Sequence, residues 1–241
     1  MEQPFNLLET ILFTPKEGFY LLDLHLKRLI QSAKELDFVK PNKQHISNLL
    51  LSNIPSNGPQ RVRLLYDKQG HTTLEHTPLS WESVNKTVDS LKMLEDTKIL
   101  NELPTLKVTL DIQPTDTNIH QQFIRNKTTE RSIYTAARER VHVGSNDIFD
   151  VILWNIDKQI TETSIANIAV GTKMKDQHGY AWKTPILDCG LLSGVFRQHL
   201  LDQDEMVEGK ITIDDLIKAQ QNNDIIVCFN SVRKIYRVYL E

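Results

Sequence analysis

Cysteines and long apolar runs are scarce in this sequence, and each absence excludes a class of protein. Cys189 and Cys228 are the only two cysteines among 241 residues, so we expect reduced thiols in a cytoplasmic protein and no disulfide framework. Their spacing does not suit a metal site, and we expect none. No run of about 18 apolar residues exists, so no transmembrane helix is predicted. Residues 1–9 have neither the basic nor the apolar part of a signal peptide.

An excess of charge of one sign is missing as well. The formal net charge is −3, and the charged fraction of 24% and hydrophobic fraction of 40% are ordinary for a globular protein. Without a basic excess, we expect neither nucleic acid nor another polyanion as a partner. The chain has no internal repeat or low-complexity segment, and its length allows one large or two modest domains.

The first part of the chain predicts two strands followed by a helix. The strands are expected over residues 6–13 and 19–22, with a turn at Pro15 and Gly18 between them. Asp23 is placed to cap the helix, and Pro41 is placed to end it. Apolar residues recur along this helix at spacings of four and three, which predicts a buried stripe. The stripe consists of Leu22, Leu26, Leu29, Ala33 and Leu36.

The following segments complete a small α+β domain. A second helix is expected over residues 45–53, whereas residues 81–100 show no clear periodicity. Strands are expected over residues 61–66, 72–76 and 106–112. Because residues 113–118 are the best linker, we place this domain at residues 1–115 and a larger domain at residues 116–241.

The second half is rich in strands with interspersed helices. Ile133, Ala137 and Val141 recur every four residues and predict a helix that Gly144 ends. A helix is expected after Gly194, and Thr212 can cap another. Strands are expected over residues 151–154, 165–170, 180–182, 224–229 and 232–240, and Trp154 and Trp182 are expected in the core.

Three motifs in this half resemble a known family. ITETSIANIAV begins at Ile160, a Thr-Pro pair follows at Thr184, and CGLLSGVFR begins at Cys189. Together they resemble the class IV aminotransferases, the fold-type-IV pyridoxal phosphate (PLP) enzymes, and within them the aminodeoxychorismate lyase branch. The resemblance runs from about Leu7 to Val238. It implies a D-amino acid aminotransferase-like fold, with a small α+β N-terminal domain and a larger barrel-like α/β C-terminal domain, and a homodimer.

The resemblance also implies a catalytic lysine and a carboxylate partner for the cofactor. RNKTTERSIYTAARERV is similar to the family segment that holds PLP, and this similarity makes Lys127 the Schiff-base lysine. Glu162 matches the family glutamate beside the pyridine nitrogen, where a carboxylate keeps that nitrogen protonated. Asn167 matches too, and we expect it to bond nearby backbone. Taken alone, a lysine such as Lys127 or a glutamate such as Glu162 is more often a surface residue.

The phosphate of PLP needs several donors. LLSGVFR resembles the family phosphate loop, which implies that the amides of Val195 and Phe196 face the phosphate at a helix start. Arg28 resembles the helix arginine that reaches the same phosphate, and a guanidinium suits that contact. Ser231 falls where the family places a hydroxyl donor.

Substrate recognition and activity follow from the resemblance less directly. Arg63 and Arg233 match positions that can bind a substrate carboxylate, although each could be a surface arginine. Ile186 and Lys234 depart from a proline and a glycine that are frequent in the family. The favoured activity is conversion of 4-amino-4-deoxychorismate to 4-aminobenzoate and pyruvate in folate biosynthesis. The alternatives are a branched-chain or D-amino-acid transaminase and a catalytically silent PLP-binding protein.

Overall fold

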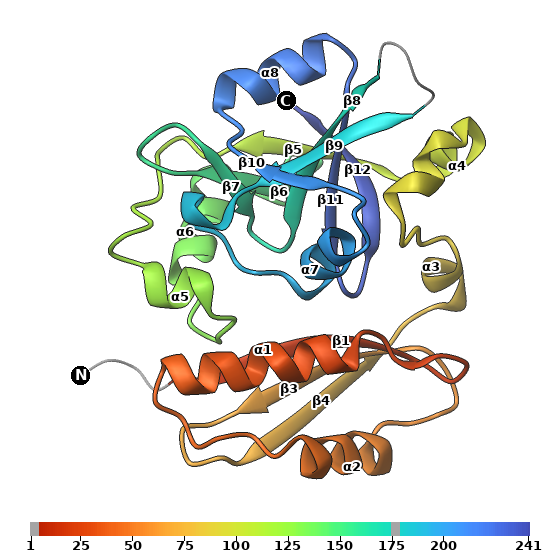
Figure 1. Ribbon diagram of the computed structural model, residues 1–241, viewed down its shortest axis with the longest axis vertical. Helices are drawn as coiled ribbons and strands as arrows, with labels where there is room; N and C mark the ends of the chain where they lie inside the picture. The colour runs from red at the N-terminus through yellow and green to blue at the C-terminus, as the bar shows by residue number, and fades with distance from the viewer. Residues whose placement is uncertain (1–4, 175–178) are drawn as a thin grey trace. The chain divides into compact units, whose positions relative to one another are not determined.

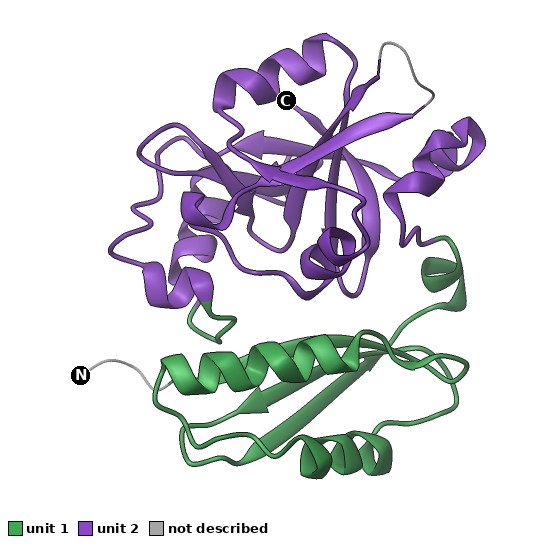
Figure 2. Cartoon of the chain, in the orientation of Figure 1, with its two compact units in different colours: residues 1–86, 126–130 green, residues 87–125, 131–241 purple. Residues whose placement is uncertain are grey.

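The protein is described by a computed structural model that covers residues 5–174 and 179–241, and its chain divides into two compact units (Figures 1 and 2). Unit 1 comprises residues 1–86 and 126–130, and unit 2 comprises residues 87–125 and 131–241. This division differs from the boundary at residue 115 that the sequence suggested. β5 (Thr105–Leu110) accounts for the difference, because it pairs with β6 (Ile148–Trp154) and β12 (Lys234–Leu240) of unit 2.

Unit 1 is an antiparallel sheet packed against two helices. The strand order is β2-β1-β3-β4, formed by β1 (Leu7–Thr14), β2 (Gly18–Phe19), β3 (Gln60–Tyr66) and β4 (Thr72–Pro78). α1 (Leu22–Glu35) and α2 (Lys43–Asn53) share one apolar core with the sheet. Alternate residues of β1 and β3 enter this core because strand side chains alternate between the two faces. These four elements contribute Leu7, Ile11, Phe13, Val62, Leu64, Tyr66, Leu26, Leu29, Ala33, Ile46 and Leu50.

The entry into α1 differs from the prediction. The second strand ends at Phe19 instead of continuing to residue 22, because Leu21 adopts a left-handed conformation with a φ of 53°. The predicted cap at Asp23 is wrong, since the helix already begins at Leu22. Asp23 instead lies in the first turn, where its negative charge interacts favourably with the helix dipole.

The exit from α1 differs as well. The helix ends at Glu35, before Pro41, so proline does not stop it. Asp37 has a φ of 57° and turns the chain first.

Three short helices occupy the segment without clear periodicity. They are α3 (Trp81–Asn85) in unit 1 and η1 (Leu91–Glu95) and α4 (Thr97–Glu102) in unit 2. Each follows a polar residue whose side chain accepts a hydrogen bond from a backbone amide of the helix. Caps therefore define these helices, and caps leave no periodic signal.

Unit 2 is built on one eight-stranded sheet with the order β10-β9-β8-β11-β12-β5-β6-β7. The strands not yet introduced are β7 (Ile160–Thr163), β8 (Asn167–Lys173), β9 (Tyr180–Pro185), β10 (Val207–Gly209) and β11 (Ile225–Asn230). The sheet curls until its two ends meet. The Ile160 amide in β7 donates to the carbonyl of Ile211, just beyond β10, at 2.7 Å. This curl is the barrel-like architecture that the resemblance implied.

The helices of unit 2 are α5 (Gln121–Arg125), α6 (Ser132–Arg140), η2 (Leu187–Cys189), α7 (Val195–Asp202) and α8 (Ile213–Gln221). The predicted helix start after Gly194 and the predicted cap at Thr212 are confirmed, and Thr212 forms a reciprocal capping box with Asp215. The helix end predicted at Gly144 is wrong. α6 ends earlier, with Val141 as its C-cap, and Gly144 lies in the turn beyond with a φ of 95°.

Both tryptophans were predicted to lie in the core, and they differ in how deeply they are buried. Trp182 is buried, and a Cβ added to Gly171 would come within 2.7 Å of its indole ring. Trp154 is only partly buried and packs at the edge of the barrel core, where its Nε1 donates to the Asp111 carbonyl.

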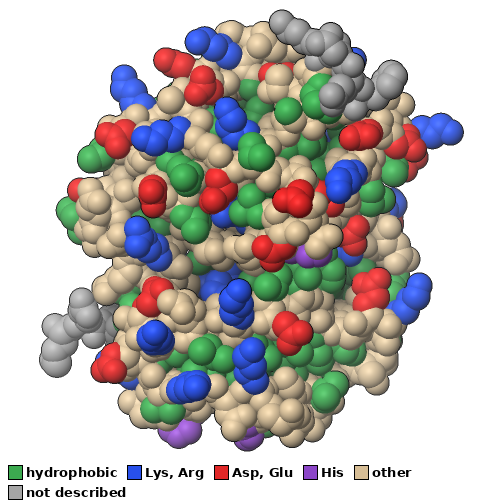
Figure 3. All heavy atoms as spheres, viewed as in Figure 1, with side chains coloured by type: hydrophobic (Ala, Val, Ile, Leu, Met, Phe, Trp, Pro, Cys, Tyr) green, Lys and Arg blue, Asp and Glu red, His purple; other side chains and the backbone are tan. Residues whose placement is uncertain are grey.

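Charges of both signs are mixed over the molecular face seen in Figure 3, where neither sign forms a continuous patch. Within residues 5–174 and 179–241, no helix is both long and apolar enough to cross a membrane.

Candidate functional site

Lys127 lies in a short extended segment of unit 1 that pairs with the start of β1. The Leu8 amide donates to the Lys127 carbonyl at 2.8 Å, and the Thr129 amide donates to the Asn6 carbonyl at 2.9 Å. The Asn6 amide in turn donates to Thr129 Oγ1 at 2.9 Å. These bonds fix the backbone around Lys127, whose side chain is half-buried and which precedes α6 as predicted.

Arg28 projects from α1 onto a buried carboxylate of β1 in the same unit. Its Nε donates to Glu9 Oε1 at 2.9 Å and its Nη2 to Glu9 Oε2 at 2.5 Å, so the pairing is bidentate. His25 Nδ1 lies 2.6 Å from the same carboxylate. Glu9 therefore fixes the direction of the guanidinium that the resemblance assigned to the phosphate.

The charge states of this group follow from its burial and partners. Burial alone would raise the pKa of Glu9, but Arg28 and His25 outweigh it and lower the pKa to about 2. Burial lowers the pKa of His25 although Glu9 opposes the shift, and the charge of Lys127 also lowers it. At neutral pH, Glu9 is therefore ionised and His25 is neutral, with Lys127 within electrostatic reach.

Arg63 lies on β3 directly opposite Glu75 on β4. Its Nη1 donates to Glu75 Oε2 at 2.6 Å, and the two side chains are 39% and 48% exposed. A cross-strand pair of this exposure contributes about 0.2–1 kcal/mol. The guanidinium remains accessible, so its predicted role with a substrate carboxylate stays a prediction.

Glu162 lies at the end of β7 in unit 2 and is buried. Tyr134 Oη donates to its Oε1 at 2.7 Å, and the Leu192 amide donates to the same oxygen at 3.2 Å. Asn167 Nδ2 lies 3.4 Å from Oε2. Burial and the negative charge of Glu162 hold the pKa of the Tyr134 phenol well above its usual range. The phenol is therefore a permanent donor, and three neutral groups orient the carboxylate.

The loop before α7 is attached to the same group. Asn167 Nδ2 donates to the Leu192 carbonyl at 3.0 Å, which confirms its expected bond to nearby backbone. A Cβ added to Gly194 would lie 1.9 Å from Asn167 Oδ1, so only glycine fits at this position. Val195 and Phe196 are the first two residues of α7, and the helix itself supplies no acceptor for their amides. Glu162 and this helix start are therefore held together within unit 2.

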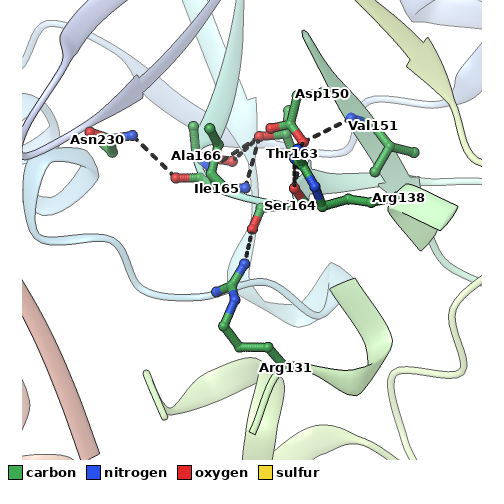
Figure 4. A network of polar contacts seen from close by, with 9 residues as sticks. All are labelled: Arg131, Arg138, Asp150, Val151, Thr163, Ser164, Ile165, Ala166 and Asn230. Carbon is green, nitrogen blue, oxygen red and sulfur yellow. Dashed lines mark hydrogen bonds and ion pairs between the residues drawn. The ribbon is translucent and has the colours of Figure 1, made fainter. Parts of the chain in front are cut away.

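Asn230 shapes the turn that carries Ser231 and Arg233. Its Oδ1 accepts from the amides of Val232 and Arg233 at 3.0 and 2.9 Å, and its Nδ2 donates to the Ile165 carbonyl at 3.2 Å. The turn is thus attached to the loop that follows Glu162 (Figure 4). Ser231 is buried there, whereas the exposed Arg233 guanidinium lies 5.2 Å from the Phe149 ring centroid.

Lys234 follows in the position where the family often has glycine. It adopts a left-handed conformation with a φ of 55°, which a glycine would adopt without strain. Its buried Nζ lies 3.1 Å from Asp89 Oδ2. The side chain therefore gains an ion pair that a glycine would lack.

A network from α6 holds the β7–β8 loop (Figure 4). The Arg131 guanidinium donates to the Ser164 carbonyl at 2.5 Å, and Arg138 donates to Ser164 Oγ at 2.8 Å. Ser164 Oγ donates in turn to Asp150 Oδ1, which also accepts from Arg138 at 3.0 Å. Thr163 Oγ1 accepts from the Ala166 amide at 3.0 Å. The loop that follows β7, just after Glu162, is thereby fixed on both sides.

Two parts of this arrangement were missed in the sequence. Glu9 had no motif assigned to it, although it is a charged residue at a core-facing position of β1. Tyr134 was passed over because the apolar period of α6 ran through Ile133 and Ala137. The spacing of Arg131, Tyr134 and Arg138 by three and four was the available signal for a second functional face.

Comparisons with known proteins identify the family of this chain. The family described as amino-transferase class IV matches residues 6–239. A Schizosaccharomyces pombe protein named "Putative aminodeoxychorismate lyase" is 31% identical over 233 residues, covering 95% of this chain and 87% of that protein. The Saccharomyces cerevisiae "Aminodeoxychorismate lyase" is 26% identical over 192 residues, covering 71% of this chain and 49% of that protein.

The fold also matches a solved structure. A "Putative amino-acid aminotransferase" from Mesorhizobium loti superposes with a TM-score of 0.77 at 27% identity. The match covers 98% of this chain and 100% of the Mesorhizobium loti chain.

Proposed function

Because this chain belongs to the class IV aminotransferase family, whose members depend on PLP, we propose that it converts 4-amino-4-deoxychorismate to 4-aminobenzoate and pyruvate. The observation that carries the choice is the 31% identity, over nearly the whole chain, to a protein bearing the lyase name.

The residues of each unit fit the chemistry of PLP. In unit 2, a buried carboxylate is held by three donors beside a helix start whose glycine has no room for a Cβ. In unit 1, a lysine on a fixed backbone lies within electrostatic reach of an arginine-bearing cluster. A carboxylate suits a protonated pyridine nitrogen, and a helix N-terminus suits a phosphate.

When bound, PLP supplies an electron sink that stabilises negative charge on the substrate carbon next to the amine. We assign two roles to Lys127. Its Nζ would bind the cofactor covalently, and once Nζ is released from the cofactor it would move protons. Glu162 would keep the pyridine nitrogen protonated through its fixed carboxylate. Arg28, Ser231 and the amides of Val195 and Phe196 would bind the phosphate.

Substrate carboxylates are assigned to Arg63 and Arg233. Both guanidiniums are at least partly accessible, and both are supported by a neighbour, Glu75 in one case and the Phe149 ring in the other. A guanidinium can bind a carboxylate with two parallel hydrogen bonds. We also propose that the protein is a cytoplasmic homodimer. Sedimentation at several protein concentrations would test the dimer.

The lyase is tested by product formation without an amino acceptor. Purified enzyme with PLP and aminodeoxychorismate, but no keto acid, should release 4-aminobenzoate and pyruvate in equal amounts over many turnovers. A transaminase would need a keto acid to complete each cycle, so without one it would stop after its first half-reaction. Failure to release products, together with amino-acid-driven conversion of the cofactor that a keto acid reverses, would replace the lyase with the transaminase.

The cofactor assignment has its own test. Borohydride treatment of the PLP-loaded protein should attach the cofactor irreversibly to the peptide that contains Lys127. Attachment at another lysine would contradict the assignment to Lys127. A protein that binds PLP but shows no spectral change with either substrate class would be the catalytically silent alternative.

A further inference from the structure

Tyr134 makes a contact whose chemical consequence goes beyond packing. Its hydroxyl donates to Glu162 Oε1 at 2.7 Å, and the side chains of Tyr134 and Glu162 are 7% and 5% exposed. A hydrogen bond to the charged form of a carboxylate lowers its affinity for a proton, and low local dielectric strengthens the effect. The phenol is a neutral donor that keeps its own proton at any working pH.

Tyr134 is itself held in place. The Arg131 guanidinium carbon lies 4.8 Å from the centroid of the Tyr134 ring, and Arg131 also donates to the Ser164 carbonyl. Arg138, one turn further along α6, donates to Ser164 Oγ. Tyr134 and Arg138 are four residues apart on one face of α6, and Arg131 is the N-cap of the same helix. These residues therefore fix both the β7–β8 loop and the Glu162 carboxylate on β7.

We propose that Tyr134 is a positioning residue for Glu162, and that its phenol keeps the proton between Glu162 and the cofactor on the pyridine nitrogen. The inference rests on the proposed cofactor role of Glu162. Without the phenol, the carboxylate is a stronger base and competes better for the shared proton. The nitrogen then carries less positive charge, and the cofactor withdraws electrons less strongly from the substrate.

The test is Tyr134→Phe, which removes the hydroxyl and keeps the ring beneath Arg131. The protein is loaded with ¹⁵N-labelled PLP, and the ¹⁵N resonance of the pyridine nitrogen should move towards that of the neutral ring. The kcat should fall by about three- to tenfold, as expected for the loss of one neutral hydrogen bond, with little change in KM. Tyr236→Phe is the matched control, because the Tyr236 hydroxyl is equally buried and has no hydrogen-bond partner among the described residues.

A second variant tests the same step in the opposite direction. Site-specific replacement of Tyr134 by a fluorinated tyrosine keeps the fold and makes the phenol a stronger donor. The ¹⁵N resonance should then move towards that of the fully protonated ring. A thermal melt of each variant separates loss of folding from loss of the hydrogen bond.

The possible outcomes separate the role of Tyr134 from the binding of PLP itself. If the parent protein shows the labelled cofactor on Lys127 but neither variant moves the ¹⁵N resonance, the role of Tyr134 is overturned while the cofactor site stands. If Tyr236→Phe moves the resonance as much as Tyr134→Phe, the effect is general packing and the role is again overturned. If the parent protein binds no PLP, both the proposed function and this inference fail.

Discussion

Each of the two units holds a buried glutamate, and the hydrogen bonds described for the two carboxylates come from different kinds of donor. In unit 1, Glu9 accepts two hydrogen bonds from the Arg28 guanidinium and contacts His25. In unit 2, Glu162 accepts from a phenol, a backbone amide and a carboxamide. A charged partner fixes a side chain strongly, whereas neutral partners orient a carboxylate and each contributes little by itself.

We therefore expect a structural role for the Glu9 carboxylate and a chemical role for the Glu162 carboxylate. Glu9 has a pKa of about 2 and serves to aim Arg28, so its charge is used inside the protein. Glu162 is oriented by several weak contacts, an arrangement suited to a carboxylate that acts on a cofactor. Changing Glu9 should therefore affect folding first, and changing Glu162 should affect chemistry first.

The largest expected effect on stability comes from Glu9→Gln. It leaves the nearly buried Arg28 without its carboxylate, and breaking a buried ion pair costs about 3–5 kcal/mol of unfolding free energy. Chemical denaturation measures this loss. Glu75→Gln, which breaks the exposed pair with Arg63, is the control and should cost about 1 kcal/mol or less. Equal losses in the two variants would show that the Glu9 cluster is not structural.

Glu162→Gln should give the opposite pattern, with a large effect on turnover. The variant keeps the shape and removes the charge, so we expect kcat to fall by about 10²–10³-fold, as for other preorganised electrostatic groups. The covalent link to Lys127 should still form, which the absorbance of the bound cofactor reports. A variant that turns over at the parental rate would assign the electrostatic role to another residue.

The pKa of Glu9 predicts a pH dependence of stability. The carboxyl has a pKa of about 2 in the folded protein against an ordinary value of 4.5 in the unfolded chain, so the unfolded state binds more protons between these values. The stabilisation is fully present above about pH 4.5 and is lost as the pH falls towards about 2, with a contribution on the order of 3 kcal/mol. Denaturation at a series of pH values should show a smaller acid-induced loss in Glu9→Gln than in the parent.

The smallest expected effect comes from Arg28→Lys. Lysine keeps a positive charge for Glu9 but loses the planar fork, so the fold should persist while PLP affinity falls by about tenfold. Arg61→Lys, at an exposed position of β3, is the control and should leave PLP affinity unchanged. Unchanged affinity in Arg28→Lys would show that Arg28 acts only within the Glu9 cluster.

The sequence predicted the elements whose signals are local. The stripe of α1, the helix start at Gly194 and the cap at Thr212 depend on spacing and on single residues, and each was found. The short strand β10 was missed because its pairing partner β9 is distant in sequence. β7 pairs with the neighbouring β6, and it was missed because Thr161, Glu162 and Thr163 are polar and gave no apolar strand signal. The left-handed Leu21 was missed because an apolar residue gives no signal for a positive φ.

The chain by itself determined the family, through motifs around Lys127, Glu162 and Gly194 that suit one cofactor. Only the tertiary structure decided which partners these residues have. Glu9 and Arg28 meet because β1 lies against α1, and Tyr134 reaches Glu162 because α6 lies against the β7–β8 loop. Hydrogen bonds between residues so far apart in sequence depend on packing, and packing leaves no local pattern from which the partners could be predicted.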